Sequence, residues 1–260
     1  NMSHELRTPL NSIIGFSRVI LKGIDGPLTE LQKTDLTSIH NSGQHLLSLI
    51  NNFLDLSKIE AGKMELNFEK VEFGPIIKGV MSTAIALVKD KPITLKQEVP
   101  ADLPVVWADP TRMRQVILNL VSNACKFTYE GEVRIQAEAD RDKVTIRVSD
   151  TGIGIPDDKI ESVFEEFTQV DASTTRKVGG TGLGLPISRH FVEMHHGDMW
   201  VESKLGDGST FSFYVPLEPP SAEPENPLPT PLKEKNRITR SLESAKLTIS
   251  WRKLRPSRHR

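Results

Sequence analysis

Apolar residues recur at helical intervals in the first quarter of the chain. One run covers residues 1–22 and ends at a glycine- and proline-containing turn, 23–27. A second run extends from Thr29 to about Glu60, carries a broad apolar stripe, and is followed by Gly62. The two patterns predict an αα-hairpin. Because two helices cannot enclose a core alone, the wide stripe favours pairing with a second copy into a four-helix bundle, and we expect a homodimer.

The hydrophobic period changes after Gly62, where a second domain is expected to begin. Alternating or short apolar runs indicate strands, and longer runs of 3.6-residue period indicate helices. In chain order the pattern predicts a strand at 64–68, a helix at 73–88, a strand at 93–99, a helix at 111–127, strands at 132–137 and 144–148, a helix at 186–194, and strands at 198–202 and 210–215. This is an α+β layer pattern. We therefore expect a hairpin domain at 1–62 and an α+β domain at 63–217.

The last part of the chain, residues 218–260, differs in composition from the rest. Six prolines between residues 219 and 231 predict an extended linker. The segment 233–260 is basic, with apolar residues at helical spacing. It is either a disordered, solvated end or a segment that touches an anionic membrane or a partner.

Charge and composition narrow the function classes. The net charge of −1 is unevenly distributed along the chain. Residues 218–260 hold ten basic and five acidic residues, so the 23 basic and 29 acidic residues before them give that part a charge of −6. An acidic body is a poor surface for nucleic-acid phosphates, so we expect no nucleic-acid partner. No apolar stretch of these 260 residues reaches the roughly 18 residues that could cross a bilayer, and we expect no signal peptide in this segment. We expect a cytoplasmic protein, attached to a membrane only through segments upstream of this sequence or through the basic tail. The single Cys125 favours a reducing compartment and a packing role.

A histidine near the start of the first helix is the first candidate for chemistry. His4 lies about 200° around the helix from Leu6, so it is expected on the face opposite the apolar seam. Thr8 follows one turn later, close to Glu5. A carboxylate next to an imidazole can take the proton of one ring nitrogen while the other nitrogen attacks phosphorus. Pro9 removes a backbone donor and predicts a kink one turn after the histidine. An exposed His-Glu pair is by itself more often surface decoration, so its context must decide.

Two asparagines lie one turn apart on the predicted helix 111–127. Asn119 and Asn123 present carboxamide oxygens on one face, which suits a hard cation such as Mg²⁺. Lys126 is close enough to meet a phosphate. A helix whose polar face happens to hold two asparagines is the alternative interpretation.

Three glycine-containing segments complete the pattern. Asp150 follows a strand directly, and its carboxylate can accept a hydrogen bond from the exocyclic amine of adenine, while Gly152 and Gly154 let the backbone approach a flat base. Glycines at 179–184 precede a helix and can expose backbone amides to a triphosphate at the positive end of the helix dipole. This segment lacks the Gly-Lys-Ser/Thr of a Walker A loop and the context of a dinucleotide fingerprint. A further segment, 206–210, precedes the last strand.

Each motif is weak alone, but their order along residues 1–217 resembles the transmitter core of a sensor histidine kinase. The matching segments are His4 to Pro9 for the H box, Asn119 to Thr128 for the N box, Asp150 to Pro156 for the G1 box, Val163 to Phe167 for the F box and Gly179 to Leu185 for the G2 box.

The resemblance implies a dimerisation and phosphoacceptor hairpin followed by an ATP-binding α/β sandwich. It implies that ATP phosphorylates His4 and that the phosphoryl group passes to an aspartate of a response-regulator receiver domain. Residues 168–181 would form a mobile lid over ATP. The segment from Glu5 to Thr8 matches a motif linked in that family to removal of phosphate from the regulator, which would make the enzyme bifunctional.

The resemblance assigns each candidate residue a role. His4, Glu5 and Thr8 would be catalytic, and Mg²⁺ would be held chiefly by Asn123, with Asn119. ATP would be bound by Asn119, Asn123, Lys126, Phe127, Asp150, Gly152, Gly154, Ile155, Phe164, Gly180, Thr181, Gly182, Leu183, Gly184, Leu185 and Thr210.

Two other functions compete with phosphotransfer. The gyrase, heat-shock chaperone and mismatch-repair ATPases share the nucleotide-binding fold but place a glutamate one turn before the metal-binding asparagine, where it positions water. Here that position is Asn119, which favours transfer to His4 over hydrolysis. The second rival is a dimeric, nucleotide-binding scaffold without phosphotransfer, against which the intact His4, Asn123 and Asp150 argue.

Overall fold

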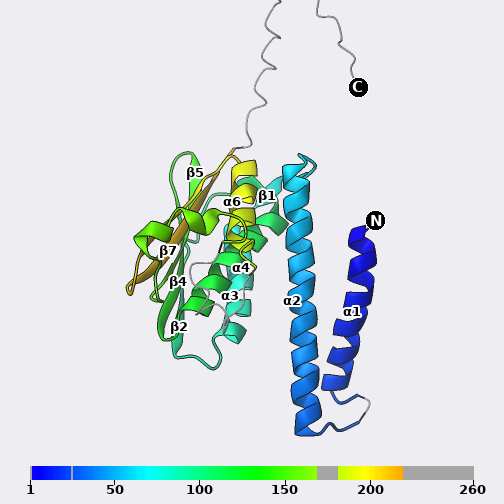
Figure 1. Cartoon of the computed structure of the whole chain (residues 1–260). Helices are drawn as coiled ribbons and strands as arrows, with labels where there is room; N and C mark the ends of the chain where they lie inside the picture. Colours follow the sequence, from blue (N-terminus) through cyan, green and yellow to red (C-terminus); the bar gives the residue numbers. More distant parts are fainter. Residues whose placement is uncertain (1, 25, 169–180, 219–260) are drawn as a thin grey trace, which may run out of the picture. The chain divides into compact units, whose positions relative to one another are not determined.

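The computed structural model of the chain describes residues 2–24, 26–168 and 181–218, with side chains from Glu5 onward. Figure 1 shows a helical hairpin followed by a sheet with packed helices, which confirms the expected fold class. The elements are α1 (Met2–Leu21), α2 (Glu30–Glu60), β1 (Glu69–Val71), α3 (Phe73–Leu87), β2 (Ile93–Glu98), β3 (Val106–Ala108), α4 (Pro110–Phe127), β4 (Gly131–Ala139), β5 (Lys143–Asp150), the 3₁₀ turns η1 (Asp157–Lys159) and η2 (Ser162–Phe164), α6 (Gly184–Met194), β6 (Met199–Lys204) and β7 (Gly208–Pro216).

The start of helix α2 is fixed by a local signal. The Thr29 hydroxyl accepts a hydrogen bond from the backbone N–H of Gln32, and the Gln32 side-chain oxygen accepts one from the N–H of Thr29. This reciprocal capping box satisfies two N–H groups that have no partner within the helix. It explains why the predicted and observed starts of α2 agree within one residue.

Helices α1 and α2 run antiparallel, and three contacts define their register. The Ser17 hydroxyl lies 3.0 Å from Nδ1 of His40. Ile14 packs against Gly43 so closely that an added β-carbon would lie 3.0 Å from its side chain. The Arg7 guanidinium donates to the Asn51 side-chain oxygen at 2.9 Å. In each contact the two residue numbers add up to 57 or 58, so the register is constant along the pair.

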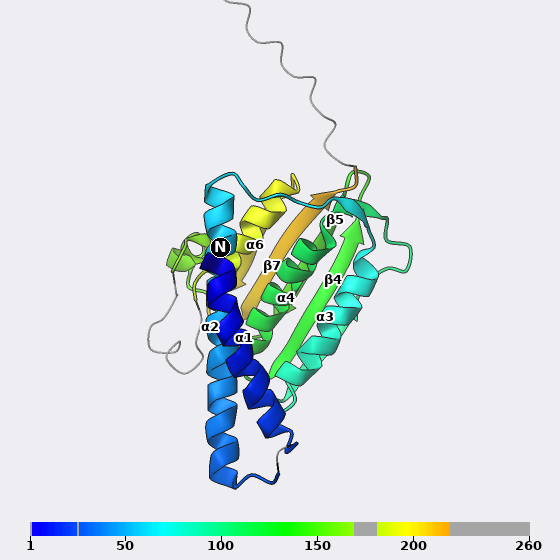
Figure 2. The ribbon, with the colours of Figure 1, turned by 90° about the vertical axis from the view of Figure 1, so that its right-hand side faces the viewer.

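A five-stranded sheet forms the centre of the second domain. Its strand order is β2-β4-β5-β7-β6, with β2 and β4 parallel and the other pairs antiparallel. Helices α3, α4 and α6 cover one face of this sheet (Figure 2). Strands β1 and β3 form a separate antiparallel pair. The result is the two-layer α/β sandwich that the resemblance implied.

The hydrophobic core of this domain lies between the sheet and its helices. Its largest fully buried side chains include Phe73, Phe191 and Phe213, and Cys125 is buried among its residues. The sheet residues that alternate with the core positions carry ion pairs such as Lys96–Glu132 and Arg147–Glu138. This alternation is typical of a sheet with one buried and one solvated face.

The structure differs from the predicted strands in two places. The strand predicted at 64–68 is wrong, because the strand in this region is β1, which begins at Glu69. The preceding segment is instead held at the start of α4, where the backbone N–H of Asn67 donates to Oδ2 of Asp109 at 3.0 Å. Its partner β3 was not predicted at all; it has only three residues. In the part of the chain that the structure describes, no helix is long and apolar enough to cross a membrane.

Candidate nucleotide and phosphoacceptor sites

Helix α4 carries the asparagine pair and begins at a strong N-cap. Oδ1 of Asp109 accepts hydrogen bonds from the backbone N–H groups of Thr111 and Arg112, and Pro110 occupies the first turn. One side of α4 is buried in the core. Asn119 and Asn123 therefore lie on its half-buried opposite side.

Asn119 connects α4 to the first two turns of α6. Its Nδ2 donates to the hydroxyl of Ser188 at 3.0 Å. Its Oδ1 lies directly against Gly184, where an added β-carbon would overlap it. The N box and the G2 box are thus in contact. Ser188 was missed in the sequence, because a serine on a helix carries no local signal of a partner 69 residues away.

Asn123 lies one turn further along α4, and its carboxamide is available to a ligand. Its carboxamide makes no hydrogen bond to any residue that the structure describes. Lys126 follows on the same helix, and burial lowers the pKa of its ammonium group. No cluster of three His, Cys, Asp or Glu side chains suits a metal ion within the described ranges. A hard cation here would therefore rely on carboxamide oxygen, phosphate and water, the ligand set that Mg²⁺ commonly takes beside a nucleotide.

Asp150 ends strand β5 in a half-buried position. Burial raises the pKa of its carboxyl to about 6, against the opposing effect of hydrogen bonds from the backbone of Gly152 and Ser209. The bond from Gly152 is 2.8 Å long. An added β-carbon at Gly152 would lie 2.5 Å from the Phe127 carbonyl oxygen, so only glycine fits between the G1 and N boxes.

The described residues on either side of the 169–180 segment are joined to each other. The N–H of Phe167 donates to the carbonyl of Gly182 at 3.1 Å. Gly182 has a φ of 68°, and an added β-carbon would lie 2.8 Å from the backbone of Phe167. The N–H of Leu183 donates to the Thr181 hydroxyl at 3.1 Å, and Leu183 itself is buried. Most of the expected lid and the predicted site residue Gly180 lie outside the described residues.

Helix α6 begins next to this junction, at Gly184. No described side chain caps its N-terminus. Its first N–H groups are consequently available to an anion at the positive end of the helix dipole. Leu185, the last residue of the G2 box, is half-buried against the core.

Three other predicted residues make contacts within the same domain. Ile155 is buried, and its N–H donates to the Ser203 hydroxyl at 2.8 Å. The ring of Phe164 packs edge-on against Phe211, and the Thr210 hydroxyl donates to Ser149 at 3.0 Å.

Gly154 is placed by close packing against a neighbouring turn. It adopts a φ of 68° and lies directly against the Lys204 carbonyl. A larger residue would need both an unfavourable backbone conformation and a shift of that turn.

The phosphoacceptor candidate lies on helix α1. The backbone of His4 is helical, but its side chain lies outside the described side chains. Glu5 and Thr8 are both exposed on the same helix. Helix α1 continues through Pro9, and the expected kink stays a prediction.

Comparisons with known proteins cover both regions of the chain. Residues 1–62 match the model of the His Kinase A (phospho-acceptor) domain, and residues 108–219 match that of the histidine kinase-, DNA gyrase B-, and HSP90-like ATPase. The circadian input-output histidine kinase CikA of Synechococcus elongatus is 43% identical over 232 residues, which are 88% of this chain and 31% of CikA. The autoinducer 2 sensor kinase/phosphatase LuxQ of Vibrio parahaemolyticus is 39% identical over 84% of this chain and 26% of LuxQ.

A solved structure extends the comparison to the fold. The crystal structure of full-length ShkA in complex with AMPPNP is 34% identical and superposes with a TM-score of 0.70, covering 85% of this chain and 46% of ShkA. The chain thus spans about a third or less of the length of the two curated relatives named above.

Proposed function

Since the chain belongs to the sensor histidine kinase family, we propose that it transfers the γ-phosphoryl group of ATP to its own His4 and then to a partner protein. The observation that carries this proposal is the environment of Asn119. This side chain donates to Ser188 and occupies the position at which the related ATPases carry a water-activating glutamate. A carboxamide is a poor base, so water is not activated there and the phosphoryl group is kept for a protein nucleophile.

The first reaction forms one bond and breaks one. A ring nitrogen of His4 attacks the γ-phosphorus of ATP, the bond from that phosphorus to the bridging β-oxygen breaks, and ADP leaves. The other ring nitrogen loses its proton, which the neighbouring carboxylate of Glu5 accepts. Imidazole is nucleophilic only when neutral, so this transfer requires the neutral ring of His4, in which one nitrogen carries a proton and the other attacks.

The nucleotide is held by residues from three segments of the second domain. Asp150 accepts a hydrogen bond from the adenine amine, and the N-terminus of α6 receives the phosphates. Asn123 would hold Mg²⁺, assisted by Asn119, and the ion would neutralise charge on the β- and γ-phosphates. Lys126 contributes positive charge at the same end of α4.

The phosphorylated histidine would serve an aspartate on a response-regulator receiver domain. A phosphoramidate is a reactive donor, so the aspartate oxygen attacks the phosphorus and the P–N bond breaks. LuxQ is named as both kinase and phosphatase, and the segment from Glu5 to Thr8 supports a second activity in this chain as well, in which water attacks the aspartyl phosphate of the regulator, the P–O bond to the aspartate breaks and inorganic phosphate leaves. Thr8 would orient the attacking water.

A homodimer would complete the hairpin. Apolar side chains remain exposed along one stripe of each helix: Leu6, Ile13 and Phe16 on α1, and Ile39, Leu46 and Phe53 on α2. Burying such a stripe against a second copy would form the four-helix bundle.

Acid–base chemistry provides the test of the proposal. Incubated with γ-labelled ATP and Mg²⁺, the chain should acquire a label that acid removes and base does not, because phosphohistidine has that lability. The variant His4→Gln should acquire none. His45→Gln is the matched control, since His45 is an exposed histidine of the same hairpin, and it should label normally. A label that survives acid, or one that persists in His4→Gln, would refute the assignment.

A further inference from the structure

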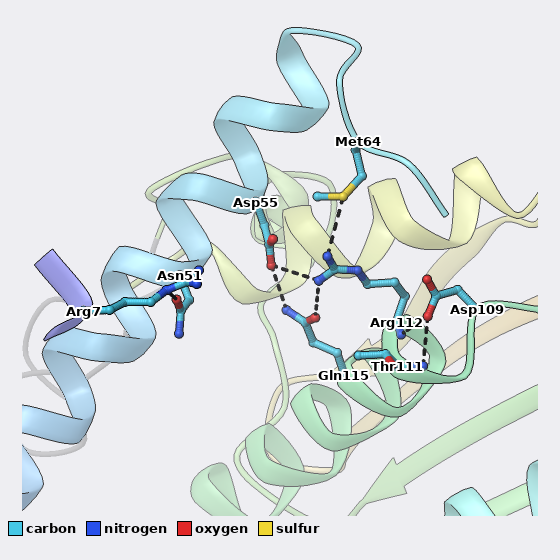
Figure 3. Close-up of polar contacts among 8 residues, drawn as sticks. All are labelled: Arg7, Asn51, Asp55, Met64, Asp109, Thr111, Arg112 and Gln115. Atoms are coloured by element: carbon cyan, nitrogen blue, oxygen red, sulfur yellow. Dashed lines mark hydrogen bonds and ion pairs between the residues drawn. The ribbon is translucent and has the colours of Figure 1, made fainter. Parts of the chain in front are cut away.

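One arginine at the start of α4 contacts both the hairpin and the helices of the second domain. Nη1 of Arg112 lies 3.2 Å from Oδ2 of Asp55 on α2 and donates to the Gln115 side-chain oxygen at 3.0 Å (Figure 3). Nη2 approaches the sulfur of Met64 at 3.6 Å. The guanidinium also stacks 4.7 Å above the ring of Phe191 on α6. Arg112 therefore touches α2, the segment after it, α4 and α6.

This contact differs from an ordinary surface ion pair. The side chains of Arg112 and Asp55 are only 21% and 15% exposed. Gln115 also donates to the same Asp55 oxygen at 3.4 Å, so the carboxylate has two partners on α4. A half-buried, multiply bonded arginine is more fixed in position than the exposed pairs, which contribute little.

The register of the hairpin places this contact beside the phosphoacceptor. Arg7 on α1 bonds to Asn51 on α2, and the constant sum of paired numbers places position 4 opposite residues 53–54. Asp55 is the next residue along α2. The ion pair therefore lies at the same height along the hairpin as His4.

The same arginine is rigidly linked to the nucleotide site. Arg112 and Asn119 are two turns apart on one continuous helix, a rise of about 10 Å. Arg112 also rests on Phe191 of α6, and α6 begins at the phosphate end of the site. A contact that fixes Arg112 relative to α2 thus fixes the phosphate-binding ends of α4 and α6 as well.

We propose that the Asp55–Arg112 contact, supported by Gln115, docks the ATP-binding domain on the hairpin at the height of His4 and so positions it for phosphoryl transfer. Arg112 and Asp55 are positioning residues in this role, since neither touches the reacting atoms. The inference rests on the proposed function and names the contact that links its two sites.

Substitution of the carboxylate gives the cleanest test, because Asp55 lies outside the nucleotide-binding domain. Asp55→Asn keeps the shape and removes the charge. We expect the rate of His4 labelling at saturating ATP to fall by about tenfold or more, since orientation of the reacting groups is lost. The affinity for a fluorescent ATP analogue should remain within about twofold, because the nucleotide contacts are unchanged. Arg112→Ala should likewise lower the rate of His4 labelling and leave the affinity for the ATP analogue unchanged.

Matched controls and a charge exchange separate docking from folding. Asp35→Asn on α2 and Arg114→Ala on α4 change exposed residues of the same types and should label at the unmodified rate. The double variant Asp55→Arg/Arg112→Asp restores an opposite pair and should recover part of the rate lost in each single variant.

The possible results distinguish the docking role from the proposed function. Labelling of Asp55→Asn at or above the unmodified rate would overturn the docking role alone, as would a loss of ATP affinity equal to the loss of rate. Absence of any His4-dependent label in the unmodified chain would refute the proposed function, and the docking role with it.

Discussion

The helical hairpin and the ATP-binding domain use their apolar residues in different ways. In the second domain the large side chains are enclosed, and Phe73, Phe191 and Phe213 have essentially no exposed surface. In the hairpin the largest apolar side chains are exposed, with Phe16 at 70% and Phe53 at 57%. The ATP-binding domain therefore satisfies its own hydrophobic surface, whereas the hairpin requires a second surface. This difference predicts different consequences for similar substitutions in the two regions.

Truncation of a core phenylalanine should show the largest effect on stability. Phe213→Ala removes a fully buried ring from β7, and we expect the free energy of unfolding of the ATP-binding domain to fall by about 3–5 kcal/mol. Urea titration followed by tryptophan fluorescence measures it. Phe16→Ala, the matched change in the hairpin, should alter that transition by less than about 0.5 kcal/mol. Equal losses in the two variants would contradict the comparison.

A charge in the exposed stripe should instead break the association of two copies. Phe53→Glu would place two carboxylates in the apolar interface, one from each copy, and weaken the dimer by about 100-fold, or roughly 3 kcal/mol. Light scattering over a dilution series measures this change. Lys33→Glu, on an exposed polar position of α2, should leave the mass unchanged. A monomeric mass for the unmodified chain at micromolar concentration would refute the dimer itself.

The two regions also differ in how well the sequence predicts them. The ends of α2 follow from local signals, the capping residue Thr29 and the glycine at position 62, and they were predicted within one residue. Strands β1 and β3 were missed or misplaced because each has three residues, too few for a period to appear, and each is defined by pairing with the other. The candidate site residues Asn119, Asn123 and Asp150 follow from short local patterns, namely two asparagines one helical turn apart and an aspartate directly after a strand.

The partners of the site residues could not be predicted in the same way. Asn119 meets Ser188 across 69 residues, and Asp55 meets Arg112 across 57. No local pattern distinguishes these polar side chains from solvated ones on the same helices. Such pairs are fixed only by the packing of α2, α4 and α6, which hydrophobic periodicity does not specify in detail.

Together with its proposed adenine role, the raised pKa of Asp150 predicts that nucleotide binding depends on pH. The ionised carboxylate is the form that accepts a hydrogen bond from adenine, so ATP affinity should fall as the pH drops through about 6 and should approach a tenfold loss per unit below it. Calorimetry between pH 5 and 8 measures this. Asp150→Asn should bind ATP weakly and without this pH dependence, and Asp140→Asn, an exposed control at the β4–β5 turn, should behave normally.

The same carboxyl acts in the opposite direction on stability without nucleotide. Its folded pKa of about 6 lies above the 3.8 that is ordinary for an aspartate, so the folded state binds this proton more tightly than the unfolded chain. Protonation of Asp150 therefore raises the free energy of unfolding as the pH falls through 6, and this stabilisation is complete below about 4.

For the binding experiment, an ATP affinity that stays constant between pH 5 and 8 would argue against the adenine role of Asp150.

The smallest effect that we expect on stability concerns the backbone strain at His196, at the end of α6 in the well-packed ATP-binding domain. Helix α6 ends in a Schellman arrangement, in which the N–H of Gly197 donates to the Val192 carbonyl and that of His196 to Glu193. His196 has a φ of 59°, in the left-handed region that glycine adopts at lower cost. Its side chain is exposed, so its removal costs little packing. His196→Gly should stabilise the ATP-binding domain by about 0.5–1 kcal/mol in urea titration, whereas His196→Ala, which keeps a β-carbon, should show no such gain. A loss of stability in the glycine variant would mean that the histidine side chain contributes a contact outweighing the backbone strain.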